Sequence, residues 1–170
     1  MAVKIRRAAL RDAQVAYSLV SEYYQAASVL LRDDRKSFSQ QYFAPGTGIW
    51  LALYDGQAVG SIALRKLLPG AAEIKRMYVR PEWRGQGISL RLLAAAERFA
   101  RETGYRWIYL DTSDEMTAAR RLYERQGYRP CPRYNRNPQA TIFMRKKLPG
   151  RIGGARSRGP KRGAPGRFET

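Results

Sequence analysis

The chain has 170 residues, of which 44% are hydrophobic, with 32 Lys and Arg against 14 Asp and Glu, a single Cys and no His. This length gives one domain with a sizeable core, and no apolar run approaches the roughly 20 residues of a membrane span or resembles a secretory signal. Without His, Ser-His-Asp and Cys-His catalysis and His-based zinc sites are excluded, and one Cys forms neither an internal disulfide nor a thiolate cage. We therefore expect a cytoplasmic protein with no metal and no membrane partner, whose acid–base chemistry uses carboxylates, tyrosine, lysine or water.

The formal net charge of +18 is extreme for a chain of this size. Most of the excess lies in residues 1–147, because residues 148–170 hold only six Lys and Arg and one Glu. A field of this sign attracts anionic ligands, such as a phosphorylated cofactor or a nucleic acid, and repels polycations. A generally basic, solvated surface is the alternative interpretation.

The spacing of apolar residues predicts the elements of the first half of the chain. In order these are a strand at 3–7, a helix at 10–31, a shorter helix at 33–43, and strands at 49–54 and 58–64. The last two strands are separated by Asp55-Gly56, which is typical of a hairpin turn.

The second half alternates strands and helices, which indicates parallel pairing. The predicted elements are a strand at 73–79, a helix at 88–103, a strand at 107–110, a helix at 116–126, and a final antiparallel pair at 128–136 and 141–147. Gly104 and Gly127 lie where these helices should end, and Thr112–Glu115 has the spacing of a capping box.

From Pro149 the chain becomes rich in Gly, Arg and Pro and loses its apolar residues. We therefore expect a folded domain over residues 1–148 and a disordered basic tail over residues 149–170. Such a tail can contact nucleic acid weakly through phosphates, although a tail that is merely solvated is the alternative.

The most informative segment is Arg84-Gly-Gln-Gly-Ile-Ser89, which stands between a predicted strand and a predicted helix. A glycine-bearing turn at this point directs free backbone N–H groups and the positive end of a helix dipole at one spot, which suits a phosphate or pyrophosphate. Taken alone, Gly-x-Gly is as consistent with an ordinary turn. The surrounding segments decide between the two interpretations.

With those segments, the chain resembles the GNAT (GCN5-related) N-acetyltransferase superfamily. Arg84–Ser89 is similar to the acyl-CoA signature [Gln/Arg]-x-x-Gly-x-[Gly/Ala] and departs from it only at Ser89. The segments 79–83 and 118–128 also look like the family pattern, and the resemblance covers residues 3–147. It implies the GNAT fold, a mixed α/β (α+β) arrangement in which about four helices flank a mostly antiparallel, twisted sheet of six or seven strands. One parallel pair would join the strands at 73–79 and 107–110.

The resemblance also implies acetyl-CoA as the acetyl donor and names the residues that would bind it. Backbone N–H groups of the signature, with the Arg84 side chain, would hold the pyrophosphate. The backbone of the preceding strand would pair with the pantetheine arm like an added strand, and an N–H there would stabilise the oxyanion. The predicted cofactor-binding residues are Met77, Tyr78, Val79, Arg84, Gly85, Gln86, Gly87, Ile88 and Ser89.

Two residues are predicted to be catalytic on the same basis. Tyr123 falls where many family members place the general acid that protonates the CoA thiolate, and a phenol suits that leaving group. Packing on the buried helix face is its alternative role. Glu73 falls where several members carry the general base, and an ordinary exposed strand residue is the alternative. Met116 stands where relatives have an asparagine for pantetheine, so that contact is not expected here.

The acceptor site should lie between the segment joining the first two helices and the last hairpin. We name Tyr24, Tyr42 and Tyr134 as candidate substrate-binding residues, with core packing as the alternative role of each. The predicted reaction is direct attack of a primary amine, that of a small molecule, on acetyl-CoA in a ternary complex. The alternatives are a protein acetyltransferase docked through the basic tail and a non-catalytic protein associated with nucleic acid. A homodimer is left open.

Overall fold

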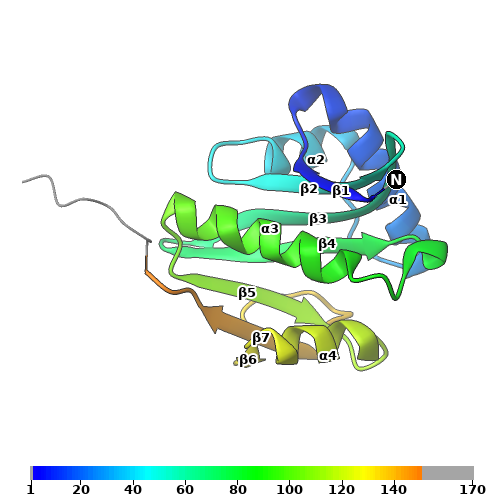
Figure 1. Cartoon of the computed structure of the whole chain (residues 1–170). Coiled ribbons are helices and arrows are strands. Elements are labelled where there is room, and N and C mark those ends of the chain that lie inside the picture. The colour runs from blue at the N-terminus through cyan, green and yellow to red at the C-terminus, as the bar shows by residue number, and fades with distance from the viewer. Residues whose placement is uncertain (1, 151–170) are drawn as a thin grey trace, which may run out of the picture.

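The computed structural model describes residues 2–150, and seven strands in this part of the chain form one sheet (Figure 1). The sheet order is β1-β2-β3-β4-β5-β7-β6, and β4 and β5 are the parallel pair, with every other neighbour antiparallel. The strands are β1 (Lys4–Arg7), β2 (Gly48–Tyr54), β3 (Gln57–Leu68), β4 (Ala71–Val79), β5 (Trp107–Thr112), β6 (Arg129–Pro130) and β7 (Ile142–Lys147). The predicted fold is confirmed, and residues 151–170 of the predicted tail lie outside the described part.

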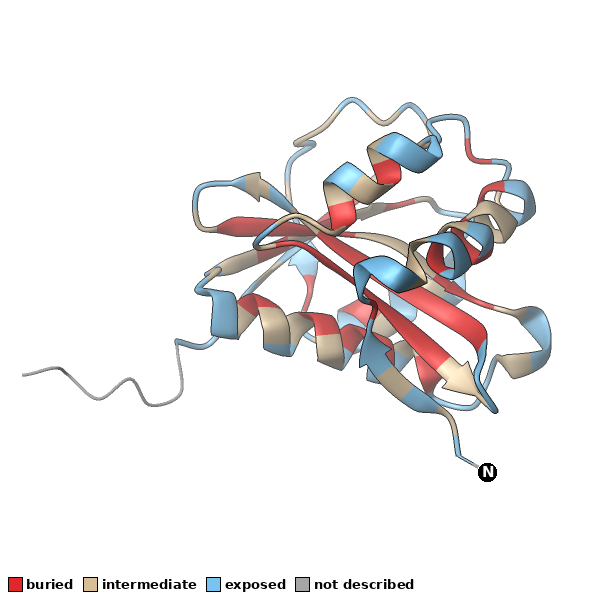
Figure 2. Ribbon diagram, turned by 90° about the horizontal axis from the view of Figure 1, so that it is seen from above, coloured by how far each residue is buried: buried red, intermediate tan, exposed pale blue. Residues whose placement is uncertain are grey.

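Four α-helices cover the two faces of the sheet, and each face has its own hydrophobic core. The helices are α1 (Ala13–Ala26), α2 (Arg35–Tyr42), α3 (Ile88–Thr103) and α4 (Thr117–Arg125). Buried side chains of α1 and α2 pack on one face, and those of α3 and α4 pack on the other, so that the strands lie between two helical layers (Figure 2). Among the described residues, none of the helices combines the length and the apolarity needed to cross a membrane.

The strands β4 and β5 pair along only part of their length. Ala71–Glu73 of β4 pairs with Trp107–Tyr109 of β5, and the pairing stops there although both strands continue. Beyond this point β4 carries a bulge, since its pairing with β3 shifts register and Arg76 has a left-handed φ of 55°. A bulge bends its strand and increases the local twist. The two strands therefore diverge and leave a split in the sheet.

Three predictions about local structure are wrong. The helix predicted to reach residue 31 ends at Ala26, and Ser28 follows with a left-handed φ of 48°. The strand predicted at 128–136 is only Arg129–Pro130, because Pro130 and Pro132 cannot donate to a ladder. The capping box predicted at 112–115 does not form, because α4 begins at Thr117 and its N-cap makes no side-chain hydrogen bond. The consequence is two long loops, residues 27–34 and 131–141, where helix and strand were expected.

Candidate active site

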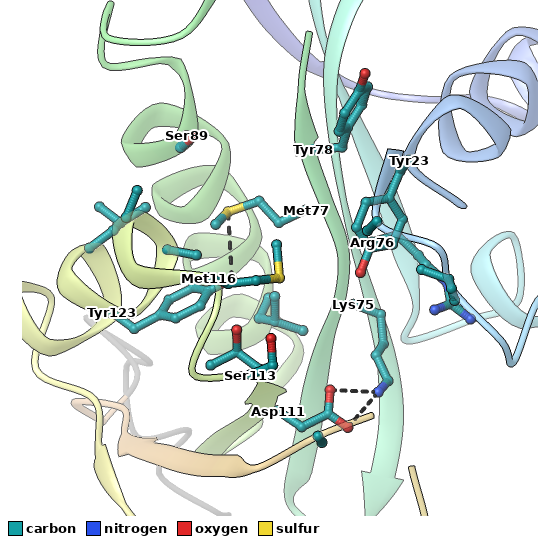
Figure 3. Close-up of a pocket in the computed structure, with 18 of the residues that line it drawn as sticks. Tyr23, Lys75, Arg76, Met77, Tyr78, Ser89, Asp111, Ser113, Met116 and Tyr123 are labelled. Atoms are coloured by element: carbon teal, nitrogen blue, oxygen red, sulfur yellow. Dashed lines mark hydrogen bonds and ion pairs between the residues drawn. The ribbon is translucent and has the colours of Figure 1, made fainter. Parts of the chain in front are cut away.

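A cavity of about 1580 Å³ passes through the split between β4 and β5. The donor half of the cavity is the part lined by residues 77–79, the turn 84–87, the start of α3, the loop 113–116 and α4. The acceptor half is the part lined by the end of α1 and the loops 27–34 and 131–141. Figure 3 shows Met77, Ser89 and Tyr123 on one side of β4, with Tyr23 and Arg76 on the other.

The turn before α3 has the backbone geometry of an anion cradle. Gly85 and Gly87 have φ angles of 75° and 74°, a left-handed conformation that favours glycine. Gly87 is the N-cap of α3 and makes no side-chain cap, so the N–H groups of the first turn are left for another acceptor. A Cβ on either glycine would have no atom within 4 Å, which means that both glycines face open space. The turn therefore fits a pyrophosphate.

Arg84 fixes this turn to the end of β4. Its Nε donates a hydrogen bond of 2.9 Å to the carbonyl oxygen of Val79, which leaves the remaining guanidinium N–H groups for an anion. Arg84 and seven other predicted cofactor-binding residues line the cavity, namely Met77, Tyr78, Val79, Gly85, Gly87, Ile88 and Ser89. Gln86 is the member of the predicted set that does not line it.

Tyr123 reaches the donor half from α4 and is only 5% exposed. Its hydroxyl lies 3.9 Å from the sulfur of Met77, so that phenol and thioether meet inside the cavity (Figure 3). Burial raises the pKa of Tyr123 well above its ordinary value, and the nearby Tyr23 and Asp111 add to the effect. The phenol is therefore protonated throughout the neutral range.

Glu73 is fully buried and does not line the cavity. It accepts hydrogen bonds from the Tyr134 hydroxyl at 2.9 Å and from the Asn135 amide at 3.2 Å. It also forms ion pairs with Arg65 at 2.8 Å and with Lys75 at 3.1 Å. A carboxylate held in this way is fully satisfied and has no direct access to an acceptor amine.

Lys75 and Asp111 connect β4 to β5 where the strands diverge. The Lys75 ammonium lies 3.0 Å from both Asp111 oxygens, and the amides of Asn135 and Asn137 donate to Asp111 at 2.6 and 3.2 Å. Burial alone would raise the pKa of Asp111, but Lys75 and the two amides outweigh it and hold the pKa below its usual value. Lys75 and Asp111 therefore form a polar floor between the two halves of the cavity (Figure 3).

The three candidate substrate tyrosines do not line the cavity. The Tyr24 hydroxyl donates to Asp33 at 2.8 Å, and Tyr42 is 1% exposed and packs on Phe38 at a ring distance of 5.1 Å. Tyr134 is turned to Glu73. Tyr23 lines the acceptor half instead. The helical spacing of apolar residues could not separate two adjacent tyrosines, because both fall near the boundary of the buried face.

Five further polar residues line the cavity and are not among the substrate-binding residues named from the sequence, namely Lys75, Asp111, Asn135, Asn137 and Gln139. The Asn-Arg-Asn-Pro turn was the available signal. Asn135 accepts from the N–H of Asn137, which in turn accepts from the N–H of Gln139. Such side-chain turns fix a loop locally but do not indicate what it faces. No group of three or more His, Cys, Asp or Glu within residues 2–150 could hold a metal ion.

The comparisons with known proteins agree on one family. The model of the acetyltransferase (GNAT) family matches residues 13–128. An uncharacterized N-acetyltransferase of Schizosaccharomyces pombe is 33% identical over 138 residues, which cover 76% of this chain and 85% of the relative. The aminoalkylphosphonate N-acetyltransferase of Salmonella typhimurium is 32% identical over 137 residues, 74% of this chain and 84% of that protein. Human N-acetylaspartate synthetase is 33% identical over 126 residues, 72% of this chain and 41% of that longer protein.

Solved structures show the same fold. A GNAT-family acetyltransferase from Staphylococcus aureus superimposes with a TM-score of 0.77 at 21% identity and covers 87% of this chain and 100% of its own. The PaiA N-acetyltransferase of Thermoplasma acidophilum, solved in complex with coenzyme A, gives 0.68 at 18% identity, with 86% and 99% covered. The glycine turn, the split sheet and these matches lead to one conclusion: the chain belongs to the GNAT family of N-acetyltransferases and takes acetyl-CoA as its cofactor.

Proposed function

We propose that this enzyme transfers the acetyl group to the primary amine of a small molecule, by direct attack while donor and acceptor are both bound. The observation that carries the proposal is the single cavity, which joins the anion cradle, Tyr123 and the two acceptor loops. A covalent acetyl-enzyme has little support. Cys131 does not line the cavity, and burial raises the pKa of its thiol.

In this proposal the residues of the donor half hold and orient the cofactor. Acetyl-CoA supplies an activated acyl group whose sulfur leaves as a thiolate. The first turn of α3 and Arg84 bind the pyrophosphate, and the backbone of Met77–Val79 pairs with the pantetheine arm. The Tyr123 hydroxyl, buried and protonated, donates the proton that the departing sulfur needs. Burial disfavours phenolate and thiolate alike, so it does not oppose this transfer.

Glu73 is a positioning residue in this proposal, because its carboxylate is enclosed by four partners. It fixes Lys75 and Asn135, and through them the polar floor and the loop that walls the acceptor half. The acceptor amine then enters as its free base or loses its proton to water, without a direct carboxylate base.

The geometry of the two acceptor loops supports a small acceptor. The Gln139 side chain accepts from the N–H of Leu30 at 2.8 Å and donates to the carbonyl oxygen of Ser28 at 3.1 Å. This clasp ties the loop 131–141 to the loop 27–34, and in this proposal it limits the acceptor half on the side where the two loops meet. The names of two relatives contain aminoalkylphosphonate and N-acetylaspartate, which are small molecules.

The test is acetyl transfer to a panel that contains small primary amines, peptides with a free N-terminus and peptides with an internal lysine. Mass spectrometry of the products measures N-acetylation of each member. We expect acetylation of small amines at rates at least tenfold above those of either peptide class. Faster acetylation of peptides would replace the small-molecule proposal by the protein-acetyltransferase alternative. Binding of coenzyme A without transfer to any member would favour the non-catalytic alternative.

A further inference from the structure

The acidic residues of the acceptor half are already neutralised. Asp33 forms an ion pair with Arg76 at 3.0 Å and accepts from Tyr24 and Gln41. Asp111 is held by Lys75 and two asparagine amides. The other acidic residues of the cavity wall, Asp114 and Glu115, belong to the loop before α4, in the donor half. Among residues 2–150, the acceptor half therefore offers no free carboxylate to a cationic acceptor.

The basic residues of the acceptor half are not all paired with carboxylates. Lys75 and Arg76 have carboxylate partners, but Arg32 and Arg136 line the cavity without one among residues 2–150. Arg136 forms no hydrogen bond or ion pair within this range, and its side chain is exposed. A third basic residue, Arg76, is also incompletely paired, because its Nε is buried and has no hydrogen-bond acceptor in the described part of the chain. A buried donor without a partner is costly until an acceptor reaches it.

Arg32 is held in place by the loop that carries it. Its Nε donates to the carbonyl oxygen of Val29 at 2.6 Å, and its Nη2 donates to that of Tyr24 at 3.3 Å. These bonds use neutral backbone oxygens, so they orient the guanidinium and leave its charge uncompensated. Arg136 belongs to the facing loop, three residues before the Gln139 clasp that ties the two loops together. Arg32 and Arg136 therefore line the same cavity from two loops that Gln139 ties together.

We infer that the acceptor amine carries an acidic group, a carboxylate or a phosphonate, which Arg32 and Arg136 bind while the amine reaches through the split toward the donor half. The inference rests on the proposed function and names the substrate class of the same site. Guanidinium groups pair with such anions through two parallel N–H donors, which fixes orientation as well as charge. An anion held at the loops keeps the amine end of a short molecule directed at the thioester.

The experiment compares amines that differ only in the acidic group. Suitable pairs are glycine and glycinamide, β-alanine and β-alaninamide, and 2-aminoethylphosphonate and ethanolamine. The measured quantity is kcat/KM of acetyl transfer at a single pH near neutrality, divided by the fraction of each amine that is free base at that pH, so that differences in amine pKa do not enter the comparison. We expect each acid to exceed its neutral partner by roughly tenfold, with the carboxylate and phosphonate arms showing which anion fits. High salt should reduce this ratio, because the cations are exposed.

Arg136→Gln is the cleaner variant, because Arg136 forms no hydrogen bond or ion pair with another residue of the described range 2–150. It should lower kcat/KM for the acids by about fivefold and leave their neutral partners unchanged. Arg32→Gln should do the same, with some added instability of its loop. Arg121→Gln is the matched control, since Arg121 is an exposed residue of α4 that does not line the cavity. It removes the same charge and should leave the ratio unchanged.

Equal use of acids and neutral amines, or an unchanged ratio in the Arg32→Gln/Arg136→Gln double variant, would overturn the inference and leave the proposed function standing. Thermal stabilisation of the coenzyme A complex by each amine gives the same comparison without turnover. Acids should stabilise the complex more than their partners, and the double variant should abolish the difference. A protein that neither binds coenzyme A nor acetylates any amine would remove the proposed function and this inference together.

Discussion

The two halves of the cavity are built in different ways. The donor half comes from two stretches of chain. In residues 77–89 the end of β4 runs through the glycine turn into α3, and residues 113–125 form the loop before α4 and α4 itself, which carries Tyr123. The acceptor half is assembled from α1, two irregular loops and β4, which are far apart in the sequence. Backbone geometry and the helix dipole shape the donor half. Hydrogen bonds and ion pairs between side chains of different loops shape the acceptor half. A local motif therefore identifies the donor, whereas the acceptor depends on contacts that only the folded chain brings together.

The largest effect should come from Tyr123→Phe in the donor half. Removing the proton donor should lower kcat by roughly a thousandfold, within the usual range for a general acid. The melting temperature should change little, because the one hydrogen-bond partner of this hydroxyl within residues 2–150 is the sulfur of Met77, at 3.9 Å. Since burial raises the pKa of this phenol above its ordinary value of 10.0, wild-type kcat should not decline below about pH 10 through its ionisation.

Tyr128→Phe is the matched control for that variant. Tyr128 packs against Tyr123 with ring centroids 5.7 Å apart, but its hydroxyl donates to Glu97 at 2.9 Å. We expect this substitution to lower the free energy of unfolding by about 1 kcal/mol and to preserve kcat. Equal kcat values for Tyr123→Phe and the wild type would remove the acid role.

The second effect concerns the anion cradle. Gly87→Ala should weaken coenzyme A binding by roughly a hundredfold, measured by calorimetry, because the Cβ disfavours φ of 74° and projects into the space that the phosphate needs. Gly56→Ala provides the same strain elsewhere, since Gly56 has φ of 76°, a Cβ position equally open, and no place in the cavity wall. Both variants should lose about 1 kcal/mol of stability. A similar loss of coenzyme A affinity in both would mean that strain alone is responsible.

The third effect lies between the halves, at Glu73. Glu73→Gln leaves Arg65 and Lys75 without this buried carboxylate and should lower the free energy of unfolding by about 3 kcal/mol. Activity should fall by the same factor at pH 7 and pH 9, because a positioning residue does not transfer the proton. Recovery of activity at pH 9 would restore Glu73 as the general base. Glu97→Gln, which alters a paired carboxylate outside the cavity wall, should cost stability without loss of activity.

The smallest effect should come from Gln139→Ala in the acceptor half. Loss of the clasp to Ser28 and Leu30 frees the two loops, so the KM for a small amine should rise about threefold while coenzyme A affinity is unchanged. Larger amines should gain relative to small ones. Gln57→Ala, at an exposed position at the start of β3, is the control. A change in coenzyme A affinity would show that the halves are not independent.

The same contrast explains what could be predicted from the sequence. The order of elements, the parallel pair and the turn at Arg84–Ser89 follow from periodicity and glycine placement, which are local properties. The resemblance places the acceptor site between the segment joining the first two helices and the last hairpin, but the lining residues could not be predicted, because the two loops that carry them were mistaken in part for helix and strand. Glu73 was correctly located on its strand, but its enclosure depends on Arg65, its cross-strand partner on β3, and on Tyr134, which is 61 residues away in the chain. Tyr24 is a candidate substrate residue named from the sequence, although its neighbour Tyr23 is the one that lines the cavity.

The most direct test of the account is the stoichiometry of one reaction in which both halves must act. The enzyme is mixed with acetyl-CoA with and without an acceptor amine, and free thiol, N-acetylated amine and the mass of the intact protein are measured together. Direct attack predicts that thiol release requires the amine, equals the N-acetylated product, and leaves the protein unmodified. Thiol release without amine, accompanied by an acetylated protein, would contradict the proposed ternary complex and point to a covalent route.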